Sequence, residues 1–294
     1  MNYSVFDTHC DTLCCVLDDN KSLEQNDCHV DLDRLTKYTS YTQVFACFID
    51  PVYKSCGAER TMNLIDLFHR TTANLPKNVK AILSIEGGEG IYSLSALRNY
   101  YRLGVRIAAL TWNFSNHIAS GAHEKDETRG LTEFGKKVVD EMNRLGMLID
   151  VSHLNRKSFY DIAEVTSMPI IATHSCSDAI CSHARNLTDE QFEVIKNTNG
   201  CVGVNFYPPF LTSGGRCTVD DIARHIDHFM SLGGEDNIGI GADFDGVDCL
   251  PEGIRGVEDT YKVFDRLLKK GYTEKQVNKI SHENFERVME KYNA

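Results

Sequence analysis

The sequence predicts an α/β fold, a closed (β/α)8 barrel of the TIM type, and three observations support this prediction. Short apolar runs recur along the chain, polar clusters follow them, and amphipathic stretches come next. The runs are almost continuously apolar, which is typical of parallel strands covered on both faces. Eight such runs fit within 294 residues, so a closed barrel is favoured over an open doubly wound sheet. We expect one domain over residues 1–294, since α/β barrels of about 250 residues form single units.

The eight predicted strands are spread over the whole chain. They are Tyr3–Asp7, Gln43–Ile49, Ala81–Ile85, Val105–Thr111, Met147–Val151, Pro169–Thr173, Cys201–Phe206 and Ile238–Ala242. Helices are predicted between them. Apolar residues recur at helical spacing from Phe134 to Leu145 before Gly146, and Thr188 with Gln191 has the spacing of a capping box. No G-x-G-x-x-G follows the first run, which disfavours the dinucleotide-binding form of the open sheet.

The composition excludes several classes of protein. With 42% hydrophobic and 25% charged residues, the chain is too apolar for a disordered protein. The 31 Lys and Arg against 42 Asp and Glu give a net charge of −11 without a basic run, so neither nucleic acid nor a membrane surface is an expected partner. No membrane-spanning stretch or signal peptide is recognisable. The 11 Cys residues, with no C-x-x-C pair, predict reduced thiols and a cytoplasmic location.

Five of the predicted strands end in histidines or carboxylates. The segments are Asp7-Thr8-His9-Cys10-Asp11, Glu86-Gly87-Gly88-Glu89, Asp150-Val151-Ser152-His153, Thr173-His174-Ser175 and Asp243-Phe244-Asp245-Gly246. In a barrel, the carboxyl ends of the strands converge on the face where active sites lie. Taken singly, each residue has an ordinary explanation as a carboxylate in a turn or a satisfied core histidine. Their joint placement is what predicts a site.

Five of these side chains form a candidate metal centre: His9, Asp11, Glu86, His153 and His174. Three imidazoles and two carboxylates fill two metal sites only if one carboxylate is shared, and Glu86 is the natural bridge. Such ligands suit Zn²⁺, Mn²⁺ or Fe. Two ions roughly 3.5–4 Å apart activate a bridging hydroxide and polarise a carbonyl, so the cluster predicts a hydrolase.

Eight segments occur in a fixed order along the chain: D-T-H-C-D, S-I-E-G-G, G-V-R-I-A-A-L-T-W-N, L-I-D-V-S-H, I-I-A-T-H-S, A-R-N-L, V-N-F-Y and G-A-D-F-D-G. Together they resemble the signature of the renal (membrane) dipeptidase family, within the metal-dependent amidohydrolase superfamily. The resemblance covers nearly the whole chain. It implies a (β/α)8 barrel, two Zn²⁺ per chain held by the five ligands above, dipeptide substrates and a possible homodimer.

The resemblance also implies roles for two further residues. Arg185, in His-Ala-Arg-Asn, matches the arginine that binds the terminal carboxylate of the substrate, which a guanidinium can hold bidentately. Asp243 matches the carboxylate beside the metals that moves a proton to the leaving amine, so Asp243 and Glu86 are the expected catalytic residues. Without the resemblance, Arg185 would be taken as a surface ion-pair partner. We expect Asp245 to cap a helix before Gly246.

Two positions depart from the family pattern. Trp112 and Asn113 stand where vertebrate members carry a His that holds the substrate carbonyl, and an indole N–H or an amide can donate a hydrogen bond there instead. We include both, with Tyr207 of V-N-F-Y, as candidate substrate-binding residues. Glu89 replaces a His that is common in relatives and is expected to add negative charge near the site.

Other histidines and cysteines are expected to have structural roles. His225 and His228 are three residues apart on one predicted helix, and we expect them on its solvated face. Cys10 and Cys176 flank candidate metal ligands and are expected to be small buried packing residues.

Two alternative functions remain open. One is amidohydrolase activity on an N-acyl amino acid, a cyclic amide or a lactone. Members of that kind often carry H-x-H on the first strand, where this chain has H-x-D, which favours the dipeptidase. The other is a non-catalytic metal-binding barrel, to which the missing family histidine gives some support.

Overall fold

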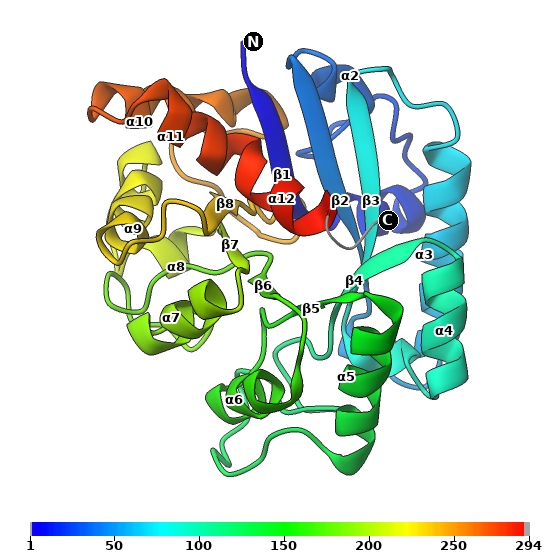
Figure 1. Ribbon diagram of the computed structural model, residues 1–294. Coiled ribbons are helices and arrows are strands. Elements are labelled where there is room, and N and C mark those ends of the chain that lie inside the picture. The colour runs from blue at the N-terminus through cyan, green and yellow to red at the C-terminus, as the bar shows by residue number, and fades with distance from the viewer. Residues whose placement is uncertain (1, 291–294) are drawn as a thin grey trace.

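The structure is a computed structural model that describes residues 2–290. Eight parallel strands pair in chain order and close into a barrel, with β8 pairing to β1 through Ile240 and Asp7. The helices lie outside the strands (Figure 1). Because each strand pairs with its neighbours in sequence, the predicted closed barrel is confirmed and an open doubly wound sheet is excluded.

The strands vary in length from three to nine residues. They are β1 (Ser4–Cys10), β2 (Ser40–Phe48), β3 (Val79–Glu86), β4 (Val105–Ala109), β5 (Leu148–Asp150), β6 (Ile170–Ala172), β7 (Cys201–Val204) and β8 (Ile238–Ile240). The α-helices are α1 (Thr12–Asp18), α2 (Leu32–Leu35), α3 (Gly57–Thr71), α4 (Leu94–Arg102), α5 (Glu133–Leu145), α6 (Arg156–Val165), α7 (Asp189–Asn197), α8 (Pro208–Leu211), α9 (Val219–Ser231), α10 (Tyr261–Lys269), α11 (Glu274–Asn278) and α12 (Asn284–Glu290). Short 3-10 helices span Pro51–Tyr53, Gly88–Gly90 and Val257–Asp259, and a π-helix spans Lys279–Glu283.

Every predicted strand overlaps an observed one, and the differences are at the ends. β1 continues three residues beyond the prediction, to Cys10, whereas β5 and β6 have only three residues each. The predicted helix signals are confirmed. Gly146 ends α5 in the left-handed conformation, and Thr188 and Gln191 form the capping box of α7.

The amino end of the barrel is closed by an apolar cluster. Phe285 of α12 packs among residues that include Phe6 of β1 and Leu148 of β5, and the rings of Phe6 and Phe285 stack with their centroids 5.8 Å apart. A Cβ placed on Gly239 of β8 would lie 2.4 Å from the Phe285 ring, so this ring rests directly on the strand. Residues 279–290 therefore cover one end of the barrel and leave the carboxyl end for the polar segments.

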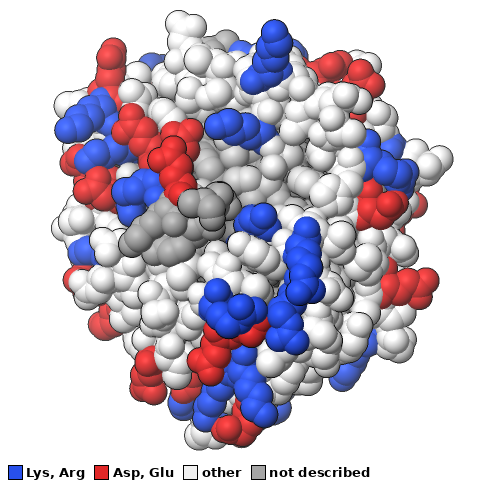
Figure 2. Space-filling model, turned by 45° about the vertical axis from the view of Figure 1, so that its right-hand side comes forward, with Lys and Arg blue, Asp and Glu red and all other residues white. Residues whose placement is uncertain are grey.

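Charged side chains of both signs share the surface, and Lys and Arg stand beside Asp and Glu at several places on the face in Figure 2. None of the helices in residues 2–290 is long and apolar enough to span a membrane. All 11 cysteines are free of disulfide bonds in the structure, and Cys10 and Cys176 are fully buried in the packing, as expected for these two.

Candidate active site and metal centre

The five predicted metal ligands lie together at the carboxyl end of the barrel. His9 is in β1 and Asp11 follows it, Glu86 is the last residue of β3, and His153 and His174 lie just after β5 and β6. The ligand atoms of His9, Asp11 and Glu86 lie within 4.8 Å of one another, and so do those of Glu86, His153 and His174. Glu86 alone belongs to both of these groups, which is the arrangement expected of a bridging carboxylate.

The potential metal-ligand atoms of this cluster face one another. Nε2 of His9 has no hydrogen-bond partner and lies 3.4 Å from Oε2 of Glu86 and 3.6 Å from Oδ2 of Asp11. Nε2 of His153 and Nε2 of His174 are 2.8 Å apart, at 2.7 and 3.4 Å from Oε1 of Glu86. All five side chains are buried. Buried carboxylates and lone pairs gathered in this way are costly unless cations lie between them, so the residues fit a pair of metal ions.

Two histidines are oriented by hydrogen bonds on the far side of their rings. Nδ1 of His153 lies 2.8 Å from Oδ1 of Asn113, and because an amide oxygen only accepts, Nδ1 carries the proton. Nδ1 of His174 lies 2.8 Å from the hydroxyl of Thr173, which in turn donates to Asp150. Each Nε2 lone pair is thereby turned toward Glu86, as in most histidine metal sites. The sequence reasoning missed the roles of Thr173 and Asp150, although both stand in the segments that it singled out.

Burial and neighbouring charges set the protonation of the cluster. Burial lowers the pKa of His153 to about 3 and also lowers that of His174, so both rings are neutral at pH 7. Burial acts to raise the pKa of Glu86, but His9 and His153 outweigh it and hold that pKa well below its usual range. Burial and the nearby Glu86 raise the pKa of Asp11 to about 7. Neutral His153 and His174 and an ionised Glu86 are the forms that bind a metal ion. Burial acts to lower the pKa of His9, but Glu86 and Asp11 overcome it and raise that pKa well above its usual value, so a metal ion would displace a proton from that ring.

Asp243 lies beside the cluster, immediately after β8. Its Oδ2 accepts a hydrogen bond from Nδ2 of Asn205 at 2.9 Å, and its Oδ1 lies 3.9 Å from Nε2 of His9. Burial raises its pKa. A Cβ on Gly246 would lie 2.2 Å from Oδ2 of Asp11 and 2.4 Å from Oδ1 of Asp243, so only glycine lets the chain pass so close to both carboxylates. Asn205, whose role the sequence did not indicate, is the second residue of the V-N-F-Y segment.

Backbone strain gathers at the same place. His153, Asp243 and Asp245 adopt φ angles of 71°, 61° and 65°, and such left-handed residues cost on the order of 1 kcal/mol or more each. The prediction that Asp245 caps a following helix is wrong. Its carboxylate accepts from the Thr12 hydroxyl at 2.6 Å and the His29 N–H at 2.7 Å, so it ties the loop after β8 to the start of α1 and to the loop before α2.

Arg185 lies in the loop between β6 and α7 and is buried, with 4% of its surface exposed. Its Nη2 donates to the backbone oxygen of His174 at 3.3 Å, and its Nε has no partner. No carboxylate in residues 2–290 forms an ion pair with it, and burial lowers its pKa. A buried guanidinium without an ion-pair partner is costly, and its fork geometry suits a carboxylate. Arg185 is not among the residues that line the pocket described below.

His225 supports the loop that carries Arg185. The prediction that it lies on a solvated face is wrong, because the side chain is fully buried. Its Nδ1 accepts the Ser177 N–H at 3.0 Å, and its Nε2 lies 3.0 Å from the backbone oxygen of Leu211. His228, in contrast, is half-buried and pairs with Asp189 at 2.8 Å.

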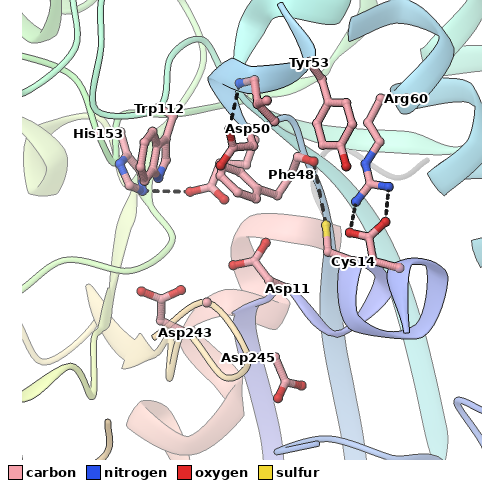
Figure 3. Close-up of a pocket in the computed structure, with 14 residues that line it drawn as sticks. Asp11, Cys14, Phe48, Asp50, Tyr53, Arg60, Trp112, His153, Asp243 and Asp245 are labelled. Atoms are coloured by element: carbon pink, nitrogen blue, oxygen red, sulfur yellow. Dashed lines mark hydrogen bonds and ion pairs between the residues drawn. The ribbon is translucent and has the colours of Figure 1, made fainter. Parts of the chain in front are cut away.

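A pocket of about 360 Å³ opens above the cluster (Figure 3). It is lined by Asp11, Cys14, Asp18, Phe48, Asp50, Val52, Tyr53, Arg60, Glu86, Trp112, His153, Asp243, Asp245 and Gly246. Its volume is that of a site for a small molecule. Metal-cluster residues therefore form its floor, and aromatic side chains form part of its wall.

The remaining predicted site residues are distributed between this pocket and its surroundings. The indole of Trp112 lines the pocket, with ring centroids 5.5 Å from Phe48 and 6.2 Å from His153. Tyr207 is not among the described lining residues and packs its ring 5.0 Å from Phe210. Glu89 does not line the pocket either: its Oε1 lies 3.4 Å from the Asn116 amide nitrogen, so its charge is directed there.

Known proteins are similar to this chain in both sequence and fold. The family model for membrane dipeptidase, peptidase family M19, matches residues 1–294. An uncharacterized dipeptidase of Schizosaccharomyces pombe is 37% identical over an alignment of 223 residues, and the match covers 73% of this chain and 53% of that protein. The crystal structure of dipeptidase AC, a metallopeptidase of family M19, has a TM-score of 0.89 at 27% identity and covers 99% of both chains. A metallopeptidase from Rhodobacter sphaeroides, solved with a phosphinate mimic of the dipeptide L-Ala-D-Ala, has a TM-score of 0.89 at 26% identity over 99% of this chain and 100% of that one.

Proposed function

Because the chain belongs to the membrane dipeptidase family, peptidase family M19, we propose that it is a zinc-dependent dipeptidase that hydrolyses the peptide bond of dipeptides. The observation that supports this proposal most strongly is the buried cluster in which Glu86 belongs to two groups of potential ligands. A second support is the buried Arg185, which lacks an anion.

We propose that two Zn²⁺ ions bind per chain. His9, Asp11 and Glu86 would hold one, and Glu86, His153 and His174 the other, which are nitrogen and oxygen donors that zinc accepts. When bound, the ions polarise the scissile carbonyl and lower the pKa of water. Asn113, whose oxygen accepts from Nδ1 of His153, acts in this proposal as a positioning residue.

Arg185 and Asp243 complete the proposed machinery. The guanidinium of Arg185 binds the terminal carboxylate of the substrate, which gives this buried cation its missing partner. Asp243 accepts the proton of the attacking water on its carboxylate and passes it to the leaving nitrogen. Burial raises the pKa of Asp243, which helps it hold that proton between the two steps, and Asn205 fixes its other oxygen. The indole N–H of Trp112 is the proposed donor to the substrate carbonyl, and Tyr207 supports Phe210, over which Arg185 lies.

We also propose that residues 1–294 form one domain, in which residues 279–290 cover the barrel that begins at β1. A cytoplasmic location is proposed because all 11 cysteines are free thiols, the state that a reducing compartment favours. A homodimer is proposed from the family resemblance alone.

The test is an assay of a dipeptide panel combined with metal analysis of the same preparation. We expect hydrolysis of dipeptides, two metal ions per chain, and loss of activity with a chelator that added Zn²⁺ reverses. N-acyl amino acids, cyclic amides and lactones are assayed beside the dipeptides. Turnover of one of those classes without turnover of any dipeptide would overturn the proposal, and metal binding with no turnover at all would support a binding protein instead.

A further inference from the structure

One carboxylate of the pocket has no place in the proposed machinery. Six carboxylates line the pocket: Asp11, Asp18, Asp50, Glu86, Asp243 and Asp245. Asp11, Glu86 and Asp243 face His9, and Asp245 holds the Thr12 hydroxyl. Asp18 makes two bonds, of 2.5 and 2.6 Å, to the guanidinium of Arg60. This leaves Asp50, for which no side-chain partner is found in residues 2–290.

The local backbone holds Asp50 in position but satisfies only one of its oxygens. Asp50 follows β2 and caps the short helix Pro51–Tyr53, where its Oδ1 accepts the N–H of Val52 at 2.7 Å. Its second oxygen has no protein donor. In Figure 3 the carboxylate of Asp50 lies at the wall of the pocket beside Phe48. The site therefore presents a fixed and unneutralised negative charge to whatever enters the pocket.

The barrel topology places Asp50 opposite Arg185. Asp50 follows β2 and Arg185 follows β6, and in a closed ring of eight strands these two are four positions apart. The candidate metal ligands of β1 and β3 come from the strands on either side of β2, and those of β5 and β6 come from the Arg185 side, so the cluster spans the barrel between Asp50 and Arg185. A short substrate that places its carboxylate on Arg185 and its scissile carbonyl on the cluster directs its other end toward the β2 side.

We propose that Asp50 binds the cationic group at the amino-terminal end of the substrate. This inference rests on the proposed dipeptidase function and adds to it a recognition site for the second charge of the substrate. An α-amino group has a pKa of about 8 and is mostly protonated at pH 7. Two metal ions would repel that ammonium, and a carboxylate that binds neither metal offsets the repulsion. A basic side chain on the first residue offers the same chemistry, and the experiment distinguishes the two sources.

The test compares Asp50→Asn with the wild type on matched substrates. The asparagine oxygen still accepts from the Val52 N–H, so the cap of the short helix is kept. The substrates are Ala-Ala, Lys-Ala and norleucyl-Ala. Propionyl-Ala, which lacks the amino group, is measured separately as a competing ligand. We expect Asp50→Asn to lower kcat/KM about 10- to 100-fold, mainly through KM, as for loss of a charged hydrogen bond. The inhibition constant of propionyl-Ala should stay unchanged, as should the metal content.

The pattern of losses identifies the group that Asp50 binds. An equal loss for Ala-Ala, norleucyl-Ala and Lys-Ala indicates the α-ammonium, and a loss confined to Lys-Ala indicates the basic side chain. The matched control is Asp126→Asn, which removes one charge from a similar turn (Asp126 Oδ1 accepts the Thr128 N–H at 3.0 Å) outside the pocket lining. Unchanged kinetics for Asp50→Asn on all three dipeptides, or an equal loss for Asp126→Asn, would overturn the inference while dipeptidase activity persists. Absence of any dipeptide turnover by the wild type would overturn the proposed function itself, and this inference with it.

Discussion

The two ends of the barrel satisfy their buried atoms in opposite ways. At the amino end, Phe6 and Phe285 stack in an apolar cluster that contributes burial and packing. At the carboxyl end, Nε2 of His9, Oδ1 of Asp11 and Nε of Arg185 are buried without partners. Buried polar atoms without partners destabilise a fold, and a chain retains them where a ligand supplies the partner. The difference indicates that one end maintains the fold and the other is arranged for binding.

Among the variants that test this contrast, Glu86→Ala is expected to lose the most activity. Because Glu86 belongs to both ligand groups, its removal should release both metal ions and lower kcat/KM on the order of 10³-fold or more, since metal ions contribute several kcal/mol to such reactions. Metal analysis and dipeptide assay of the purified variant measure both effects.

Glu89→Gln is the matched control for Glu86→Ala. Glu89 is a half-buried glutamate three residues further along, and it contacts Asn116 instead of the cluster. We expect it to keep two metals and wild-type activity. Two metals per chain in Glu86→Ala would show that Glu86 does not bridge them.

The next largest effect is expected for Arg185→Ala. Loss of a bidentate, charge-assisted contact should reduce kcat/KM about 100-fold for dipeptides, with the metal content unchanged. Arg185→Lys should recover little of this, because an ammonium lacks the planar fork of a guanidinium.

A dipeptide amide, which lacks the terminal carboxylate, provides the substrate-side control. It should be a poor substrate of the wild type and should lose little further activity with Arg185→Ala. If the variant cleaves Ala-Ala at the wild-type rate, Arg185 does not recognise the carboxylate.

A smaller effect is expected for Asn113→Ala, which acts through His153. Without the acceptor for Nδ1–H, the ring loses its fixed orientation, and outer contacts of metal ligands are typically worth 10- to 100-fold in affinity or activity. Asn113→Asp keeps an acceptor and should restore zinc affinity toward the wild-type value, measured by competition with a chelator. Equal zinc affinity of Asn113→Ala and wild type would show that this contact does not position His153.

The sequence predicted the fold and the cluster for a definite physical reason. Periodicity and caps report local structure, and parallel strands bring their carboxyl ends together wherever the barrel closes, so His9 and His174 could be joined across 165 positions. The predicted fold is confirmed by the strand order, and the family by the match over residues 1–294.

What the sequence did not predict depends on tertiary contacts between loops. His225 has the spacing of a helix surface, yet the loop after β6 and α8 both fold onto it and bury it. The position of Asp245 before a glycine suggested a helix cap, yet its carboxylate accepts a hydrogen bond from the hydroxyl of Thr12, a residue 233 positions earlier in the chain. Asp50 directly follows the predicted strand Gln43–Ile49, as Glu86 follows Ala81–Ile85, but only its place in the pocket and its unpaired oxygen distinguish it from an ordinary carboxylate in a turn.

The smallest effect on catalysis is expected at the amino end of the barrel. Phe285→Leu removes the ring that stacks on Phe6 and rests on Gly239, and it should lower the free energy of unfolding by about 1–2 kcal/mol. Urea denaturation of the metal-loaded protein measures that loss. The value of kcat/KM per folded chain should stay within about twofold, because the ring lies in the apolar cluster at the amino end of the barrel and does not line the pocket. A tenfold fall in kcat/KM with both metals retained would show that packing at the closed end sets the geometry of the site, and the division between the two ends would then be wrong.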